Sequence, residues 1–411
     1  MRYVFFIFIM FLFISASSDD NKEEIIKPEL KAKPAILKMI AAMGDNSSIV
    51  LKDITVHEKE KLGDFAKGWH KMKITGPGSR NYCLKMAWME DRKRAFFCGA
   101  NHGSPTRFND AWEYDLASNT WVMLYVPDYN DRDKITEYDK KVLVLKDGWL
   151  RTKKGGPAHP AHTWWGLTYD PNLKAAVWYC AWPGYRLKEK LDAIGAKKED
   201  LYKGPPMWLF YTKTKKWEPM KTAKPWPKTN AYAASLEYIP ELKGSLFQFR
   251  KQNFLLDVNT KSWKNMSGTV GLPPESILCY DTSRKIIIAH RGPVKKNNPR
   301  TWHMSVKDGK IGSWEKVAED KNLPNGHDAR SFMYFDSIGK VAILYEKTTN
   351  LIWVYHPDTK KWEKMVPKGA PSPFIEKKNR SIGYYDVARN VFVIIGHKAV
   401  WCYRYKKSNR T

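Results

Sequence analysis

Cysteine is scarce in this 411-residue chain, and its five copies form no CxxC pair and no zinc-ligand spacing. This scatter excludes a dense cysteine metal motif, and the odd number leaves at least one thiol outside any intramolecular disulfide. Cys83 and Cys98 fall on neighbouring strands of one predicted hairpin. A disulfide between them and two separate buried thiols are the two alternatives. A helical HExxH zinc motif is absent as well.

No apolar run reaches the ~20 residues of a comfortable membrane span. The longest run, YVFFIFIMFLFI, follows Met1-Arg2 and precedes the small residues SASS, with cleavage near Ala16–Ser18. This pattern predicts a signal peptide over residues 1–17, and an uncleaved anchor is the alternative. No cysteine follows the run, which argues against a lipid anchor of the bacterial type. We therefore expect a secreted or periplasmic monomer with no membrane span after cleavage.

Acidic residues are few relative to basic ones: 43 Asp and Glu stand against 70 Lys and Arg, a formal net charge of +27. An exported protein seldom meets nucleic acid. The charge therefore favours acidic polysaccharide or an anionic cell surface as the partner. The alternative is a solvated lysine surface, because many lysines lie in turns such as KTKK (213–216) and DTKK (358–361).

Aromatic residues are plentiful, with 18 Trp and 21 Tyr, and they reveal a repeat. Segments such as KKWEPM (215–220) and KKWEKM (360–365) recur about every 50 residues, with one double gap. Their tryptophans are Trp69, Trp121, Trp217, Trp263, Trp314 and Trp362. Upstream of most of them lie an apolar strand with a polar turn and, before that, a complete hairpin such as ILCYDTSRKIIIAHR.

Four strands in about 50 residues make one blade of a β-propeller, so we predict an all-β fold of six four-stranded antiparallel blades over 65–411. The last hairpin lacks a tryptophan strand, and KGWHKMKI (67–74) is such a strand without a blade. We therefore expect an N-terminal strand to complete the C-terminal blade and close the ring. Insertions are expected at about 124–161 and 184–206. Seven blades is the alternative, if 124–161 hides a degraded blade. Residues 18–64 form a Lys/Glu-rich segment with a short helix at 34–44, either packed on the propeller or flexible.

The Tyr-Asp pair before a turn, followed by the tryptophan, resembles the pattern of kelch and galactose-oxidase-type β-propellers over roughly residues 65–405. The resemblance implies the architecture and no particular chemistry. The Gly-Gly doublet that ends the second strand of a kelch blade is missing: single glycines stand in CGAN and IIGH, and none in LYEK.

Antiparallel connectivity places the 4→1 and 2→3 connections of every blade on one face of the ring, and both insertions belong to that face. Most of the unusual histidines and arginines fall there too. The candidate substrate-binding residues are Arg80, Arg107, Arg186, Arg250, Arg291, Arg330, Arg380 and Trp182. Arginine binds carboxylate in a bidentate fork, and aromatic rings can stack on sugars, so the set favours an acidic glycan.

Two kinds of chemistry fit this face. Histidines from five blades could hold a divalent metal such as Zn, Ca or Mn, although the alternative is that they are hydrogen-bonded groups at strand ends. The candidate ligands are His102, His162, His290, His327 and His397. A uronate polysaccharide lyase would use His162 or His102 as base and Tyr185 as acid, with arginine neutralising the carboxylate. Arg80, Arg250 and Arg330 are the arginines assigned to that role.

Hydrolysis by two carboxylates fits worse, because the face is poor in acids, and no Ser-x-Asp-x-Gly-x-x-Trp turn points to a sialidase. A galactose-oxidase-like copper site would need a Tyr–Cys pair, and Cys180 and Cys98 are more simply core residues. A non-catalytic propeller that binds glycan or protein is the other class of function.

Overall fold

The structure is a computed structural model of the 411-residue chain. It describes residues 29–408 apart from 60–75, 79, 81, 101–106, 131–134, 181–185, 267–269, 294–296, 326–330, 375–380 and 397. The predicted signal peptide and the 67–74 strand therefore lie outside the described residues. No described helix is both long and apolar enough to cross a bilayer.

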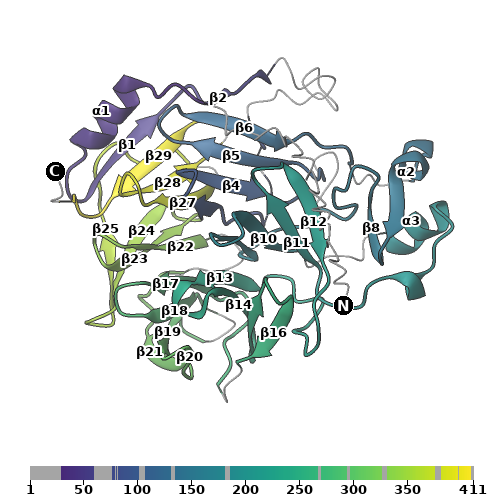
Figure 1. The fold of residues 1–411 in the computed structure, drawn as a ribbon. Helices are drawn as coiled ribbons and strands as arrows, with labels where there is room; N and C mark the ends of the chain where they lie inside the picture. The colour runs from purple at the N-terminus through teal and green to yellow at the C-terminus, as the bar shows by residue number, and fades with distance from the viewer. Residues whose placement is uncertain are drawn as a thin grey trace, which may run out of the picture.

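Six small sheets stand around a common axis, and each is an antiparallel meander of four main strands (Figure 1). The innermost strands contact one another in a closed ring. They are β3 (Ala87–Met89), β9 (Leu167–Asp170), β13 (Ser235–Ile239), β17 (Ile277–Asp281), β22 (Ser331–Asp336) and β27 (Ile382–Asp386). The second strands are β4 (Arg94–Cys98), β10 (Ala175–Tyr179), β14 (Gly244–Phe249), β18 (Ile286–Arg291), β23 (Val341–Glu346) and β28 (Val391–Ile395).

The outer strands complete the six blades, numbered here from β3 (blade 1) to β27 (blade 6). The third strands are β5 (Ala111–Asp115), β11 (Met207–Tyr211), β15 (Gln252–Asp257), β19 (Arg300–Lys307), β24 (Leu351–His356) and β29 (Val400–Arg404). The fourth strands are β6 (Thr120–Tyr125), β12 (Lys216–Met220), β16 (Ser262–Asn265), β21 (Glu315–Glu319), β25 (Lys361–Met365) and β1 (Ser47–Leu51). The fold is thus a six-bladed β-propeller, as predicted.

The ring is closed by β1, which comes from the N-terminal part of the chain and pairs with β29 of blade 6. Ser47 lies opposite Arg404 and Leu51 opposite Val400. The prediction that an N-terminal strand completes this blade is confirmed, but the strand is not the 67–74 segment from which we expected it. The reason is that β1 carries no tryptophan, so the repeat gave no sign of it. Short strands extend some sheets: β2 (Thr55–Val56) on β6, β26 (Lys368–Gly369) on β1 and β20 (Lys310–Ile311) on β19.

The helix predicted at 34–44 is α1 (Pro34–Ala42), and it packs on the propeller. Ile36 and Ile40 are buried in the hydrophobic cluster that also contains Cys402 of β29. Arg404 donates to the carbonyl oxygens of Ile40 (2.8 Å) and Met43 (2.7 Å), which satisfies the last turn of the helix. In Figure 1, α1 lies beside β1 at the closing blade.

The tryptophans of the repeat join each blade to the one before it. Trp217 of blade 2 donates its indole N–H to the carbonyl oxygen of Asn109 in blade 1 (3.1 Å). Trp263 of blade 3 donates to Thr222 (2.9 Å), which follows β12 in blade 2. Trp314 and Trp362 repeat the contact, donating to Asn253 (3.3 Å) and Thr301 (2.8 Å). The repeat therefore encodes blade-to-blade packing, since a buried indole needs both a cavity and an acceptor.

The aspartates of the Tyr-Asp pairs stabilise the turns between the first and second strands, on the face opposite to the insertions. Asp281 accepts the backbone N–H groups of Ser283 (2.8 Å) and Arg284 (3.0 Å), and Asp170 and Asp386 cap equivalent turns. This is Asx-turn chemistry, which favours Asp at the end of a strand.

Side chains from non-adjacent blades meet at the centre of the ring. Trp165 of blade 2 donates to the carbonyl oxygen of Ser331 in blade 5 (3.0 Å), and both are buried. Lys85 of blade 1 donates to Leu236 O (2.6 Å) and pairs with Glu237 in blade 3. Contacts between non-adjacent blades must cross the axis, so these side chains bridge the centre of the ring.

All five cysteines are buried free thiols. Of the two alternatives for Cys83 and Cys98, the structure therefore has the buried thiols. Burial raises the pKa of the Cys83 thiol to about 11.

Candidate functional site

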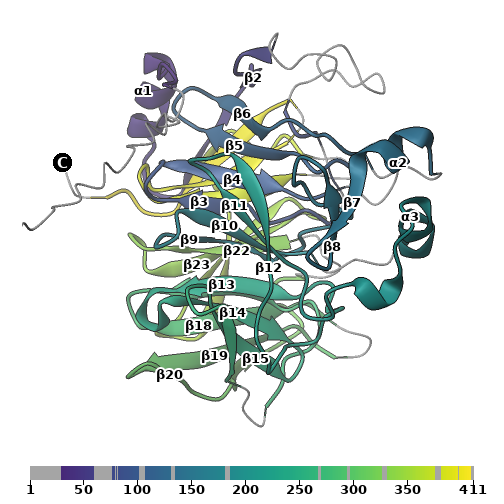
Figure 2. The same cartoon turned by 45° about the vertical axis from the view of Figure 1, so that its right-hand side comes forward.

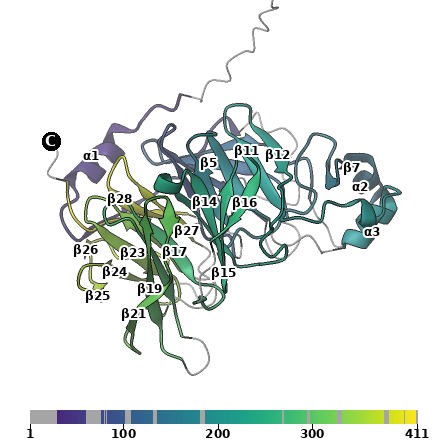
Figure 3. The same ribbon diagram turned by 60° about the horizontal axis from the view of Figure 1, so that its bottom comes forward.

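The two predicted insertions pack together into a small lobe at the side of the ring (Figures 2 and 3). The first contributes α2 (Glu137–Val142) and the hairpin of β7 (Leu143–Lys146) and β8 (Trp149–Thr152). The second contributes α3 (Leu187–Ala193) and a short 3₁₀ helix (Lys198–Asp200). Their shared core contains Tyr129, Leu143, Leu150, Ala158 and Leu191. Residues 124–161 are thus an insertion and not a seventh blade.

The start of α2 is fixed by its own sequence. Thr136 caps the helix by accepting the backbone N–H of Asp139 (3.4 Å), and the Asp139 carboxylate accepts the backbone N–H of Thr136 (2.6 Å). This reciprocal capping box turns a six-residue segment into a defined helix.

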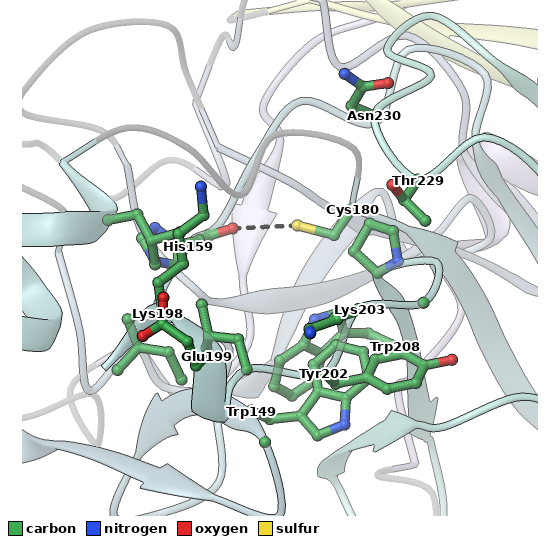
Figure 4. A pocket seen from close by; sticks show the side chains of 16 residues that line it. Trp149, His159, Cys180, Lys198, Glu199, Tyr202, Lys203, Trp208, Thr229 and Asn230 are labelled. Atoms are coloured by element: carbon green, nitrogen blue, oxygen red, sulfur yellow. Dashed lines mark hydrogen bonds between the residues drawn. The ribbon is translucent and has the colours of Figure 1, made fainter. Parts of the chain in front are cut away.

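A cavity of about 520 Å³ lies between the lobe and blade 2 (Figure 4). Its walls come from the hairpin β7–β8, the 2→3 connection of blade 2, and the 4→1 connections before β9 and β13. The lining residues are Gly148, Trp149, Leu150, His159, Cys180, Leu187, Lys198, Glu199, Leu201, Tyr202, Lys203, Gly204, Pro206, Trp208, Thr229 and Asn230. A volume of this size suits a small ligand or a short stretch of a polymer.

Three aromatic rings form one wall of the cavity (Figure 4). Trp149 lies 5.1 Å from Tyr202 and 5.5 Å from Trp208 between ring centroids. The Tyr202 hydroxyl is held by Thr222, accepting its backbone N–H at 2.9 Å. The indole N–H of Trp149 is buried without a hydrogen-bond partner among the described residues. The wall therefore offers flat apolar ring faces to the cavity.

His159 lies apart from the three rings in Figure 4, and its surroundings fix its protonation. The ammonium group of Lys190 donates to His159 Nδ1 (3.0 Å) and to the carbonyl oxygen of Ala158 (3.2 Å). Burial, and then the charge of Lys190, lowers the pKa of His159 well below its usual range. Because an ammonium can only donate, Nδ1 accepts and Nε2 carries the proton. Nε2 is buried and has no partner in the described part of the chain.

Basic side chains flank the cavity on the same face. Lys198 and Lys203 line it and are exposed. Lys228, next to the lining residue Thr229, lies over the ring of Phe249 (5.9 Å), and Arg250 lies over the same ring (5.3 Å). One acidic residue, Glu199, lines the cavity. This side of the face therefore carries net positive charge.

A second aromatic group lies where the inner strands of blades 1–3 begin. The rings of Tyr82 and Tyr232 each lie 5.9 Å from the ring of Trp164, and His162 packs against Trp164 (4.9 Å) and Tyr82 (5.1 Å). Tyr82 is 40% exposed and Tyr232 58%. Trp164 and Trp165 are both buried, so the packing role expected for one of them holds for both.

The predicted arginines divide into two kinds. Arg80 is buried and paired with Asp110 (2.5 Å), Arg291 is buried and paired with Glu275 (2.9 Å), and Arg107 is buried. Arg186 begins α3 and pairs with Glu189 (2.8 Å). Arg250 alone among these five is exposed, with no ion pair to any described acid. Of these five described arginines, Arg250 is therefore the one positioned to receive an anionic ligand without giving up an ion pair.

The predicted histidines also divide. His162 is buried, and its Nδ1 donates to the carbonyl oxygen of Ala100 (2.8 Å), which leaves Nε2 as the basic nitrogen. His290 is fully buried between Thr301 (3.1 Å) and the carbonyl oxygen of Pro324 (2.9 Å). Burial lowers the pKa of His290 to about 4. Both of its nitrogens are used, so its role is structural.

The other predicted site residues lie outside the described residues: His102, Trp182, Tyr185, His327, Arg330, Arg380 and His397. Within the described part of the chain, no group of three or more His, Cys, Asp or Glu side chains could hold a metal ion. We therefore derive no step through a metal.

The chain was compared with known proteins. No protein-family model matches any part of it, and no curated protein is similar to it at a significant level. The β-propeller class thus comes from the structure itself, and the kelch-like type is a resemblance of sequence pattern.

Sequence reasoning missed the cavity, because it forms only where two insertions meet blade 2. The signal available was the aromatic content of those insertions, Trp149 and Tyr202, beside apolar residues that a solvated loop does not need. It also missed Tyr82 and Tyr232, single aromatics in short connections.

Proposed function

We propose that this chain is an exported β-propeller that binds acidic polysaccharide on the face carrying the lobe. The observation that carries the proposal is the aromatic cavity with lysines at its edge. Sugar rings present apolar faces that suit Trp149, Tyr202 and Trp208. Their hydroxyl oxygens can accept hydrogen bonds from the exposed lysines that line the cavity, Lys198 and Lys203.

The charge of the face favours an anionic sugar over a neutral one. Lys198 and Lys203 line the cavity with a single acid, Glu199, and Lys228 and Arg250 lie together over Phe249 beyond the lining residue Thr229. A carboxylate or sulfate group near Arg250 would gain a charge-assisted, bidentate contact. The net charge of +27 adds long-range attraction for a polyanion.

Binding is tested by titrating the purified chain with acidic and neutral polysaccharides at low and high salt. We expect affinity for acidic polymers that falls with salt, because exposed charges are screened. Arg250→Ala should weaken binding by about tenfold, the size of one charged hydrogen bond. Lys361→Ala, a matched loss of charge at the exposed start of β25 on the opposite face, should not change it. Equal affinity for neutral polymers, or equal effects of both variants, would contradict the proposal.

Polysaccharide lysis is the second candidate, and the hydrogen bond of His162 favours it. With Nδ1 donating to Ala100 O, Nε2 is the nitrogen that can accept a proton. In β-elimination, His162 would remove the proton next to a uronate carboxylate, and the C–H electrons would form the new double bond. The glycosidic oxygen would leave with its bonding pair and take a proton from Tyr185.

The new double bond absorbs ultraviolet light, so an absorbance assay on uronate polymers tests lysis directly. We expect activity that His162→Gln abolishes while binding persists, since glutamine keeps a donor for Ala100 but cannot act as base. Binding of uronate polymers without any absorbance change would leave the chain a non-catalytic binding propeller.

A further inference from the structure

Two tyrosines beside Trp164 are exposed, unlike the described repeat tryptophans, which are buried or half-buried. Tyr82 and Tyr232 come from two different 4→1 connections, before blades 1 and 3, yet both rings meet the Trp164 ring of blade 2. They are 40% and 58% exposed, while Trp164 itself is buried. Three successive blades thus contribute one aromatic platform, which we call the axial platform, at the mouth of the ring.

The backbone beneath the axial platform is held in an unfavourable conformation. Tyr82, Trp164 and Ala233 have φ values of 60°, 42° and 60°, in the left-handed region that side chains other than glycine seldom adopt. Trp164 N–H donates to Tyr82 O (2.7 Å), and Lys85 N–H donates to Trp164 O (3.3 Å), which fixes the strained residues. Strained, cross-braced backbone of this kind is concentrated at ligand sites, where it presents side chains in one orientation.

The axial platform and the cavity share two connections of the chain. Tyr232 N–H donates to Asn230 O (3.1 Å), and Asn230 lines the cavity. On the other side, only two residues separate the lining residue His159 from His162, which packs on Tyr82 and Trp164. One extended ligand can therefore reach both places.

We propose that the axial platform is a second subsite, on which pyranose rings of the bound polymer stack while its acidic group lies at the cavity and Arg250. This inference rests on the proposed function. A sugar fits better than a protein partner because the exposed part of the platform consists of two flat, hydroxyl-bearing rings, with no exposed large aliphatic side chain among the described residues of the same connections. Such rings offer a stacking face and a polar edge. The subsite makes a definite statement about specificity: long oligosaccharides gain affinity from Tyr82 and Tyr232, and short ones do not.

The test is a series of acidic oligosaccharides of one repeat, from the disaccharide upward, titrated against the full mature chain. We expect wild-type affinity to rise with length and then level off. Tyr82→Ala and Tyr232→Ala should each weaken binding of the long members by about five- to tenfold and leave the disaccharide unaffected. Tyr82→Phe and Tyr232→Phe should keep most of the affinity, because the stacking face remains and only the polar edge is lost.

Tyr138→Ala is the matched control, since Tyr138 on α2 is 39% exposed but lies outside both groups. It should bind every length as the wild type does. One outcome separates the two proposals: the wild type binds, Arg250→Ala binds more weakly, and both tyrosine-to-alanine variants bind every length as tightly as the wild type. In that case the axial platform is not a subsite and the proposed function stands. If the wild type binds no acidic saccharide, both proposals fail together.

Discussion

Arg80 offers the sharpest test of the site, because sequence and structure assign it opposite roles. By sequence it belongs to the carboxylate-binding arginines, but its guanidinium is 1% exposed and pairs with the fully buried Asp110 (2.5 Å). It also donates to the carbonyl oxygens of Pro77 (3.1 Å) and Gly99 and packs on the ring of Phe97. The structure therefore predicts that Arg80→Ala damages stability and not affinity.

The magnitude follows from what the substitution leaves behind. Without Arg80, Asp110 would be a buried carboxylate with one remaining hydrogen-bond donor among the described residues, the indole N–H of Trp112 (2.6 Å). Removing one partner of a buried ion pair costs about 3–5 kcal/mol. Replacing both, as Arg80→Met with Asp110→Asn, removes the stranded charge and keeps an acceptor for Trp112. That double variant should recover most of the lost free energy of unfolding.

Urea denaturation measures the free energy of unfolding, and titration with an acidic polymer measures affinity on the folded fraction. Arg250→Ala is the converse case, because the Arg250 side chain is exposed. The free energy of unfolding of this variant should stay within about 0.5 kcal/mol of the wild-type value, while its affinity for the polymer falls. If Arg80→Ala unfolds like the wild type and loses binding, the buried ion-pair reasoning is refuted and the sequence assignment is correct.

Three further predictions concern the scaffold. His290 has a pKa near 4 in the fold against about 6.5 when unfolded, so unfolding takes up a proton between these values. Stability is thus full above pH 6.5 and lost as pH falls towards 4. Relative to His290→Gln, the wild type should lose about 1.4 kcal/mol per pH unit in that window, measured by urea denaturation at each pH. A chain that begins at residue 53 lacks β1 and leaves the β29 edge open, so it should associate in size-exclusion chromatography, whereas one that begins at residue 29 should not. The five cysteines should resist alkylation in the native protein and all react in denaturant, as counted by mass spectrometry; fewer than five would reveal a disulfide.

Much of the fold could be predicted because the repeat records packing that every blade shares. The tryptophans and the Tyr-Asp pairs recur since each blade needs an indole against its neighbour and a capped turn. These gave six blades, the insertions and the face on which they emerge. The closing strand was misplaced because β1 pairs through its backbone and needs no tryptophan.

For the candidate site, the sequence predicted which face of the propeller carries it but not which residues come together there. Arg80 and Asp110 are thirty residues apart, and nothing in their spacing shows that they pair. Arg250 and Arg80 look alike in sequence, and only burial separates them. The cavity and the axial platform depend on side chains from different connections, so they exist only after the ring has formed.

The lysines of the turns also qualify the meaning of the net charge. Lys93, Lys174 and Lys285 occupy equivalent turns of three blades with φ between 51° and 55°. Part of the charge of +27 thus repeats with the blades on the opposite face, as the solvated-surface alternative expected. The choice between acidic polymers should therefore depend on the few cations near the cavity, whereas the total charge adds only long-range attraction.

The closing blade ties the order of folding to the order of synthesis. Asn46, beside β1, accepts a hydrogen bond from Tyr403 of β29, 357 residues further along the chain. At a usual ribosomal rate of about 5–20 residues per second, β1 waits roughly 20–70 s for that partner to be made. Blades 1–5 can assemble from neighbouring strands as they emerge, but blade 6 cannot. The first strand of the ring to be synthesised is therefore among the last to pair. A nascent chain that stops short of Val400 lacks β29, so β1 has no partner strand and blade 6 stays incomplete.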